Sequence, residues 1–390
     1  NETAVWHDTD NATEYVTDRN GNTTTYVYCS EGNIISETDP LGNTTTYGYD
    51  ERGNLLSRID PLGQVWIWTY DEFDNQLTET DPLGHTTTRT YSALGDLLTT
   101  VDPNGGTTAL QYDSAGNLTQ YTDPVGNSFV MQDIAPNGQP ETIIDPTGSV
   151  VAATYDNQGN LTTREHRDAN GDLLARYAFT HDANGNRLSE TLYRTVDGTV
   201  EALATKYAYD ALNQLVETVN PMGGVQRIEY NSLGKESARV DALGRRTEFE
   251  YDAVGNLIRT SYADSTFEAL VYDSEGNLLR KIDQGGREES YEYDALNRRI
   301  RVIRADGSSV QTEFLADGNV SAETDANGNR TVYAYDTAGR RISVTYPMVY
   351  DAVSGANVTP TTQQEYDPVG RQTAFIDANG QRTEFEYDAA

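Results

Sequence analysis

Tyrosine directly followed by aspartate is a pairing of reactive side chains that recurs along this sequence. The segment from Tyr49 to Gly63 reads YDERGNLLSRIDPLG, and closely similar segments begin at Tyr112 and Tyr272. A phenol beside a carboxylate could transfer a proton, so each pair is a candidate for general acid–base chemistry. A structural unit would also repeat such a pair, and the spacing of the pairs distinguishes the two explanations.

The tyrosine of the pair returns every 21 residues over most of the chain. Eighteen positions keep this register, and 14 of them hold tyrosine. The register positions are His7, Tyr28, Tyr49, Tyr70, Tyr91, Tyr112, Asp133, Tyr155, His181, Tyr209, Tyr230, Tyr251, Tyr272, Tyr293, Phe314, Tyr335, Tyr366 and Tyr387. Such a period indicates a repeat array, in which each unit packs mainly on its neighbours.

One repeat contains two predicted strands and two predicted turns. Apolar and polar residues alternate up to Tyr49, which is typical of a half-buried strand. Asp50 to Gly53 then fits a type I turn closed by a glycine, and a second strand leads to a similar turn at Asp60 to Gly63. We expect the aromatic residues of neighbouring strands to stack on one face of the sheet.

These units predict an all-β fold, an array of about 18 antiparallel hairpins in one long twisted sheet. Intervals of 26, 28 and 31 residues interrupt the period and predict lengthened hairpins. We expect a single array over residues 1–390, which is regular over 1–130, irregular over 131–208, regular over 209–345, a long hairpin over 346–365 and regular over 366–390.

Calcium binding is a more specific chemical hypothesis than proton transfer, because four segments place oxygen ligands at alternate positions. They are Asp168–Asp172, Asp182–Asn186, Asp325–Asn329 and Asp377–Gln381. An EF-hand loop needs glycine at its sixth position and a bidentate glutamate at its twelfth. Here glycine is fourth, and the twelfth residues are Phe179, Tyr193, Asp336 and Asp388. We favour ordinary turns and predict no metal ligand.

The remaining reactive side chains show no catalytic pattern. Cys29 is the only cysteine and stands where most repeats have aspartate, so we interpret it as a simple substitution. The four histidines are His7, His85, His166 and His181, and none of them forms a pair with metal-ligand spacing. No nucleophile elbow or phosphate loop occurs. The sequence therefore predicts no catalytic or cofactor-binding residue, no cofactor and no enzymatic activity.

The composition is strongly acidic and poor in apolar residues. A net charge of −33 would repel nucleic-acid phosphates and anionic membranes, so neither is an expected partner. Hydrophobic residues make up 36% of the chain, which indicates a thin sheet rather than a deep core. No apolar run approaches the roughly 18 residues of a membrane span, and we recognise no targeting signal. The sequence begins and ends in mid-repeat, so we expect a longer parent chain.

The line Tyr-Asp-x-x-Gly-Asn-Leu followed by Asp-Pro-x-Gly resembles the YD repeat of the Rhs family. That family includes bacterial polymorphic toxins, the shell subunits of insecticidal toxin complexes and, more distantly, the animal teneurins. The resemblance covers nearly the whole chain and is closest in residues 49–64, 251–259 and 377–388. It implies a sheet that spirals into a hollow shell around a toxic C-terminal segment of the same polypeptide. The aspartates that release the toxin in that family, and the toxin itself, have no counterpart here.

We therefore expect a structural shell segment of an Rhs-type toxin that encapsulates a C-terminal cargo polypeptide. Its other expected partners are the remaining shell repeats of the same parent chain, and the parent is expected to be secreted or at the cell surface, in association with the cell wall. The alternative is an extracellular module, teneurin-like or cell-wall-binding, that binds carbohydrate or mediates adhesion. Its aromatic platform would have to come from Trp6, Trp66 and Trp68.

If the aspartate-rich segments are turns without a metal, calcium should leave the stability of the chain unchanged. We expect the same melting temperature in excess calcium and in excess chelator, measured by circular dichroism. A rise with calcium would favour the metal site instead, because a ligand that binds only the folded state stabilises it.

Overall fold

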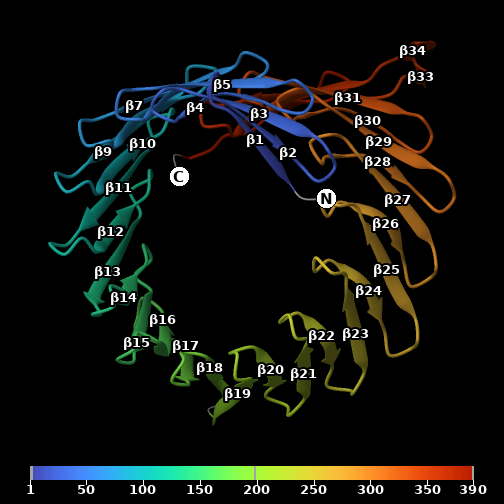
Figure 1. Cartoon of the computed structure of the whole chain (residues 1–390). Coiled ribbons are helices and arrows are strands. Elements are labelled where there is room, and N and C mark those ends of the chain that lie inside the picture. The colour runs from blue at the N-terminus through green and yellow to red at the C-terminus, as the bar shows by residue number, and fades with distance from the viewer. Residues whose placement is uncertain (1–2, 197–198, 389–390) are drawn as a thin grey trace. The chain divides into compact units, whose positions relative to one another are not determined.

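The computed structural model describes residues 3–196 and 199–388, and the regular elements in these ranges are all β-strands (Figure 1). The expected all-β fold of antiparallel hairpins is confirmed. The chain forms two compact units: the first combines Asn1–Thr107 with Ala269–Ala390, and the second is Thr108–Glu268. None of the described residues forms a helix that could cross a membrane.

The first unit contains two segments, each a series of antiparallel strands in sequence order. Segment 1 (residues 1–107) contains β1 (Ala4–Asp8), β2 (Thr13–Thr17), β3 (Thr23–Tyr28), β4 (Ile34–Thr38), β5 (Thr44–Tyr49), β6 (Leu55–Ile59), β7 (Val65–Tyr70), β8 (Gln76–Thr80), β9 (Thr86–Tyr91) and β10 (Leu97–Val101). Segment 2 (residues 269–390) contains most of β25 (Phe267–Tyr272), then β26 (Leu278–Ile282), β27 (Glu288–Tyr293), β28 (Arg299–Ile303), β29 (Ser309–Phe314), β30 (Val320–Thr324), β31 (Arg330–Tyr335), β32 (Arg341–Thr345), β35 (Thr361–Tyr366), β36 (Gln372–Ile376) and β37 (Arg382–Glu384). Between β32 and β35, strands β33 (Val349–Asp351) and β34 (Ala356–Val358) form a separate two-stranded sheet.

The second unit repeats the same antiparallel pattern with longer strands in its middle. Its strands are β11 (Thr107–Tyr112), β12 (Leu118–Thr122), β13 (Ser128–Ile134), β14 (Pro140–Ile144), β15 (Val150–Tyr155), β16 (Leu161–Arg167), β17 (Leu173–His181), β18 (Arg187–Val196), β19 (Thr199–Tyr209), β20 (Leu215–Val219), β21 (Val225–Tyr230), β22 (Glu236–Val240), β23 (Arg246–Tyr251) and β24 (Leu257–Ser261). Strands β17, β18 and β19 have 9, 10 and 11 residues, so the long intervals around His181 lengthen hairpins, as expected.

Most repeats are hairpins with one extra residue in the second strand, whereas β1–β2 and β13–β14 pair without a shift. In β5 and β6, Tyr49 pairs with Leu55, but the preceding Gly48 pairs with Ser57. The register therefore shifts by one residue, which makes a β-bulge and increases the local twist. The same shift occurs at Tyr70 and at Tyr293. The bulge is thus part of the repeat.

Both predicted turns form as the sequence indicates. The carbonyl oxygen of Asp50 accepts a hydrogen bond of 3.1 Å from the backbone N–H of Gly53, which has a φ of 88°. At the second turn, the Asp60 carbonyl accepts a bond of 2.9 Å from Gly63, which has a φ of 81°. Only glycine adopts this left-handed conformation without steric cost, which explains why it usually holds this position; Asp74, Asn213 and Asn297 replace it in the first turn of their repeats.

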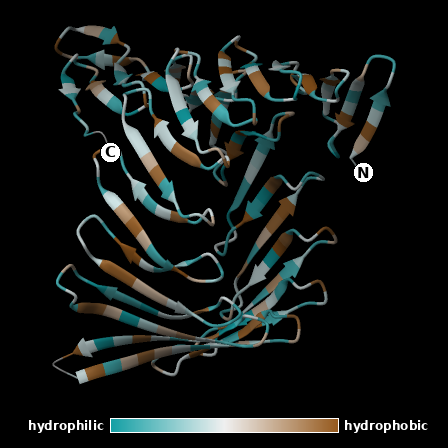
Figure 2. Cartoon of the chain, turned by 90° about the vertical axis from the view of Figure 1, so that its left-hand side faces the viewer, coloured by the Kyte–Doolittle hydropathy of each residue, from teal (hydrophilic) through white to brown (hydrophobic). Residues whose placement is uncertain are grey.

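Burial is shallow, in agreement with the low hydrophobic content. Among the described residues, no large side chain is fully buried, and Figure 2 shows polar and apolar residues mixed along the strands. Three alanines that follow a register position by eight residues are completely buried: Ala238, Ala322 and Ala374. At the first of them, an ion pair of 2.6 Å between Glu229 on β21 and Arg246 on β23 spans the intervening strand β22. The arginine–glutamate pair thus shields the small alanine side chain from solvent, a task that larger apolar side chains perform in a hydrophobic core.

Aromatic side chains contact cations more often than one another, so the expectation of stacked aromatic rows was wrong. The described residues contain three close ring pairs, whereas 11 arginine or lysine groups lie over a ring. The guanidinium of Arg298, for example, lies 4.4 Å from the ring centre of Phe314. Strands rich in aromatic residues alternate with strands poor in them, so rings of successive repeats are about two strand spacings, or ~9.6 Å, apart. That separation exceeds the roughly 7 Å limit of a ring–ring contact.

In many repeats the hydroxyl group of the register tyrosine joins the repeat to the one before it. Tyr293 donates a hydrogen bond of 2.9 Å to the carbonyl oxygen of Leu278, the first residue of β26. Equivalent bonds of 2.8 to 3.1 Å run from Tyr91 to Gln76, Tyr209 to Arg187, Tyr230 to Leu215, Tyr335 to Val320, Tyr366 to Arg341 and Tyr387 to Gln372. In every case the acceptor begins the bulged strand, where the ladder is interrupted.

Removal of this hydroxyl should weaken the contact between repeats. We expect Tyr293→Phe to lower the free energy of unfolding by about 1 kcal/mol, because the Leu278 carbonyl loses its donor. The matched control is Tyr49→Phe, since the Tyr49 hydroxyl forms no hydrogen bond to a residue that the structure describes. Urea denaturation of both variants measures the difference, and equal effects would contradict this role.

Candidate functional site

The repeated tyrosine–aspartate pair is built as a joint between strand and turn. One carboxylate oxygen of Asp50, Oδ1, accepts the backbone N–H groups of Arg52 and Asn54 at 2.9 and 2.8 Å. The other, Oδ2, accepts the side-chain amide of Asn54 at 3.0 Å. These hydrogen bonds, the Asn54 amide first, lower the pKa of Asp50, while burial raises the pKa of Tyr49. Both pKa values move away from neutrality, so the pair is unsuited to proton transfer near pH 7.

The histidines and the cysteine lie in different hairpins and do not form a common site. His85 Nδ1 is 3.0 Å from Asp81 Oδ2, which repeats the contact that Asn43 makes with Asp39 in the equivalent turn. His7 Nδ1 is 2.9 Å from Glu14 on the paired strand. Cys29 occupies the aspartate position of its turn and is half-buried. His166 lies within β16, and His181 ends β17.

The four aspartate-rich segments form turns, as predicted. Asp182 Oδ1 accepts the backbone N–H groups of Asn184 and Asn186, each at 2.9 Å, and Asp182 Oδ2 accepts the Asn186 amide at 2.9 Å. The glycines of the four turns have φ between 81° and 87°: Gly171, Gly185, Gly328 and Gly380. Turn geometry therefore accounts for the aspartate, asparagine and glycine in these segments. That they bind no metal stays a prediction.

The most specific long-range feature is a contact between two rows of turns within the first unit. We call the turns of segment 1 that follow the second strand of each hairpin the DP edge of segment 1: residues 18–21, 39–42, 60–63, 81–84 and 102–105. We call the turns of segment 2 that follow the register position the YD edge of segment 2: residues 273–276, 294–297, 315–318, 336–339 and 367–370. Each row has five turns, and the two rows meet.

Asparagine–aspartate hydrogen bonds mark both ends of this contact. At one end, Asn20 Nδ2 donates to Asp273 Oδ2 at 2.9 Å. At the other, Asn104 Nδ2 donates to Asp367 Oδ2 at 3.0 Å. The donor is the third residue of its turn and the acceptor the first of its turn in both cases. At the end marked by Asn20, the backbone N–H of Arg19 also donates to the carboxylate of Glu275. The first and the fifth turns of the two rows are therefore in matching register.

Burial shows that the contact extends between these ends. The third residue of each turn in the YD edge of segment 2 is half-buried: Glu275, Leu296, Asp317, Ala338 and Val369. The same position is exposed in segment 1: Glu31, Arg52, Phe73 and Leu94. On the opposing row, Asp60 is only 6% exposed. All five turns of the YD edge thus lose solvent contact where the rows meet.

A polar cavity of about 270 Å³ lies in the middle of this contact. Arg58, Asp60 and Trp66 line it from segment 1. Asp317, Asn319, Thr337, Ala338 and Gly339 line it from segment 2. The guanidinium of Arg58 lies 4.7 Å from the ring centre of Trp66, so one face of this tryptophan ring already has a partner.

The sequence analysis did not identify the residues of this contact. One signal was present: Asn20 and Asn104 stand at turn positions that Leu41, Leu62 and Leu83 occupy in the three turns between them. The partners Asp273 and Asp367 each follow a register tyrosine, as the aspartates of most other repeats do, although Asp367 alone is followed by proline. The 21-residue period therefore does not indicate this contact between residues more than 250 positions apart in the sequence.

The asparagines at the ends of the contact should matter only where a turn faces them. We expect Asn104→Asp to lower the melting temperature, because it places a second carboxylate within hydrogen-bond distance of Asp367. Asn327→Asp is the matched control, since Asn327 holds the same turn position on an exposed turn of segment 2. Thermal denaturation of both variants tests this, and equal melting temperatures would contradict a contact at Asn104.

Comparison with known proteins identifies the repeat. The RHS Repeat family matches residues 30–61, 49–86, 91–128, 230–266, 272–309, 314–347 and 366–390, together more than half of the chain. No curated protein matches the chain in sequence. The fold is similar to three solved structures: TcdB2-TccC3 without hypervariable C-terminal region (12% identity, TM-score 0.56), TcdB2-TccC3-TEV (13%, 0.51) and TcdB2-TccC3-Cdc42 (15%, 0.51).

The similarity to these structures covers 96%, 95% and 98% of this chain but only 27%, 25% and 24% of the other chains. The chain therefore spans about a quarter of the length of the proteins it resembles, and the likeness is one of fold. The match in sequence extends through both segments of the first unit and into both ends of the second. The chain belongs to the RHS-repeat family.

Proposed function

We propose that the chain is a non-enzymatic segment of a protein wall that encloses a polypeptide passenger of the same parent chain. The observation that carries the proposal is the contact between the two rows of turns, because it joins hairpins laterally that the ladder alone leaves apart. Membership of the RHS-repeat family and the shell-type fold of the TcdB2-TccC3 structures support it.

The proposed mechanism is physical exclusion. Within the array, strands such as β6 pair with a neighbour on each side, so their backbone groups are not available to a protease or to an unfolded chain. Where turns of two segments meet, the contact also narrows the space between hairpins. A passenger behind such a wall would be kept from proteases until the wall opens.

The partners in this proposal are the passenger, expected on the C-terminal side, and the remaining repeats of the parent. The parent would be a toxin that is secreted or held at the cell surface. One TcdB2-TccC3 structure is described as lacking a hypervariable C-terminal region, which supports a passenger that differs between relatives. The net charge of −33 makes nucleic acid an unfavourable partner.

Carbohydrate binding is less well supported. Of the three tryptophans, Trp66 has a guanidinium over its ring, and only Trp6 is among the strongly exposed hydrophobic residues, at 59%. Trp6 itself packs on Tyr15, with ring centres 4.9 Å apart. The described tryptophans therefore do not form the exposed platform that this alternative requires.

Limited proteolysis of the full-length parent tests the enclosure. We expect the passenger to resist digestion in the intact parent and to become sensitive when Asn20→Asp and Asn104→Asp weaken the contact between the rows of turns. Asn327→Asp serves as the control and should leave the passenger protected. Rapid digestion of the passenger in the intact wild-type parent would refute the proposal.

A further inference from the structure

The cavity between the two rows of turns contains the most deeply buried charged side chain of the described residues. Asp60 is 6% exposed, whereas every other described aspartate, glutamate, arginine and lysine is half-buried or exposed. The Oδ1 atom of Asp60 accepts the backbone N–H groups of Leu62 and Gln64 at 2.9 and 2.8 Å. Its Oδ2 atom accepts no hydrogen bond from a described residue. A buried carboxylate oxygen is unfavourable unless another molecule supplies a donor.

The residue four positions after Asp60 explains the free oxygen. In the preceding turn of the same edge, Asn43 holds that position and donates its amide to Asp39 Oδ2 at 2.8 Å. Gln64 holds the position after Asp60, and its side chain forms no hydrogen bond with a described residue. The most buried carboxylate of the described chain therefore lacks the partner that its neighbour has.

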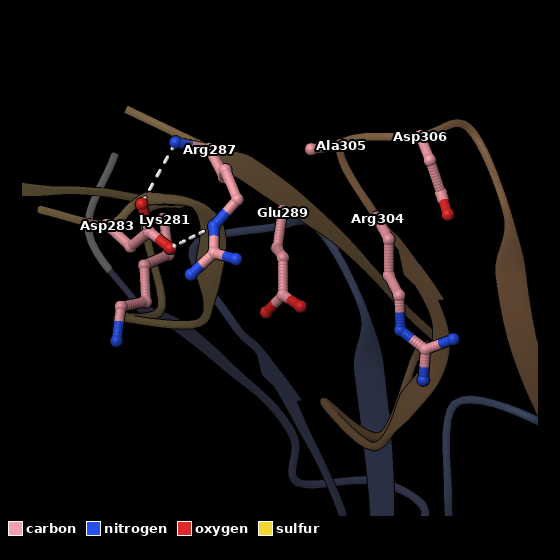
Figure 3. Close-up of a pocket in the computed structure, with 7 residues that line it drawn as sticks. All are labelled: Lys281, Asp283, Arg287, Glu289, Arg304, Ala305 and Asp306. Carbon is pink, nitrogen blue, oxygen red and sulfur yellow. Dashed lines mark hydrogen bonds and ion pairs between the residues drawn. The ribbon is translucent and has the colours of Figure 1, made fainter. Parts of the chain in front are cut away.

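Figure 3 shows the pocket at the same place of the repeat in segment 2, where Asp283 corresponds to Asp60 and Arg287 to Gln64. Its dashed lines join the backbone N–H of Arg287 to Asp283 Oδ1 at 3.0 Å and the guanidinium Nε to Oδ2 at 2.8 Å. Arg287 thus neutralises this carboxylate, and the described residues that line the pocket all belong to segment 2. The cavity at Asp60 differs in both respects, since its carboxylate has a free oxygen and its walls come from both segments.

A guanidinium group without an anionic partner lines the cavity beside Asp60. Arg58 forms no ion pair and donates no hydrogen bond to a described residue. Its guanidinium lies over the ring of Trp66, 4.7 Å from the ring centre, and this contact restricts it. The N–H groups of Arg58 stay available for an anion, and a guanidinium binds a carboxylate well because two parallel hydrogen bonds form.

Segment 2 adds uncharged acceptors to the cavity. Asn319 Nδ2 donates to Asp317 Oδ2 at 2.9 Å, so the Asn319 carbonyl oxygen Oδ1 remains free. Thr337 also lines the cavity, and its hydroxyl group forms no hydrogen bond with a described residue. The volume of about 270 Å³ is near the lower end of the ~300–1,000 Å³ that is typical of small-molecule sites. Free donors on one residue and free acceptors on several others match a small molecule with both a carboxylate and an ammonium group.

We propose that this cavity binds a free α-amino acid. The carboxylate of the amino acid pairs with the guanidinium of Arg58, and its ammonium group donates to Asp60 Oδ2. Asn319 Oδ1 and the Thr337 hydroxyl group are further acceptors for the ammonium group. Because the first two residues belong to segment 1 and the last two to segment 2, the bound molecule joins the two rows of turns. The site requires no passenger and is independent of the enclosure proposed above.

Isothermal titration calorimetry of the full chain with L-alanine as the probe tests the site. We expect one saturable site with a dissociation constant of about 1 mM or lower. The melting temperature should rise with L-alanine, because the ligand binds only the folded state. Propionate lacks the ammonium group and ethylamine lacks the carboxylate, so each should bind at least about tenfold more weakly. Equal binding of either compound would overturn the proposal, and so would L-alanine that produces neither saturable heat nor a higher melting temperature.

Two substitutions remove one charge each from the cavity. Asp60→Asn should abolish binding but keep the turn, because Asn220 accepts both backbone N–H groups of the equivalent turn in another repeat, each at 2.9 Å. Arg58→Gln should weaken binding at least about tenfold and leaves no described carboxylate without its partner. Asp283→Asn is the matched control, since it changes the same repeat position in the pocket of Figure 3, and it should leave binding unchanged.

Circular dichroism verifies that each variant is folded. Binding that survives both cavity variants refutes the proposal. Binding that is lost in Asp283→Asn refutes it as well, because the amino acid would then occupy the pocket of segment 2.

Discussion

The hydrogen bond from the register tyrosine to the repeat before it constrains where the array can vary. Tyr293 reaches 15 residues back to Leu278, but Tyr209 reaches 22 residues back to Arg187, and Tyr366 reaches 25 residues back to Arg341. The acceptor is the first residue of the bulged strand in every case, so extra residues do not displace the bond. They are accommodated beyond it, in the distal ends of hairpins such as β18–β19 and in the added hairpin β33–β34. In the repeats that form this bond, the tyrosine and the bulge are therefore the fixed part, and the second turn is the variable part.

Polar contacts replace a hydrophobic core in this sheet. Turn aspartates accept backbone N–H groups, and many of them also accept a side-chain N–H group, so their negative charge is compensated locally. These hydrogen bonds lower the pKa of Asp113, for example, with the Asn117 amide as the largest cause. In later repeats an arginine replaces the asparagine and does two tasks. Arg340 bonds to Asp336 at 2.7 Å and also lies over the ring of Tyr366, 5.1 Å from its centre. A chain with 61 acidic residues can thus form a continuous sheet because many of its carboxylates are acceptors within turns.

The local structure was predictable from the sequence, and the long-range structure was not. Asp50 and Gly53 specify a turn through their own backbone chemistry, and alternation up to Tyr49 specifies a strand, so hairpins, their order and their number follow from the period. The prediction of ring stacking was wrong for a simple reason. Period-two alternation shows which face of the sheet a ring occupies, but it does not show that a strand poor in aromatic residues separates the rings of successive repeats. The Asn20–Asp273 contact was missed because it depends on the twist accumulated over many hairpins, which no single repeat encodes. The absence of a catalytic site remains a prediction.

The added hairpin β33–β34 shows that the two edges of segment 2 differ in whether they can accommodate an insertion. It replaces the short turn between β32 and β35 and therefore projects from the same edge as turns 304–307 and 325–328. An insertion of this size on the YD edge of segment 2 would separate the turns that Asn20 and Asn104 hold together. Beside turns 304–307 and 325–328 it is compatible with the fold. The insertion therefore lies on the edge of segment 2 that the contact between the two rows of turns does not use.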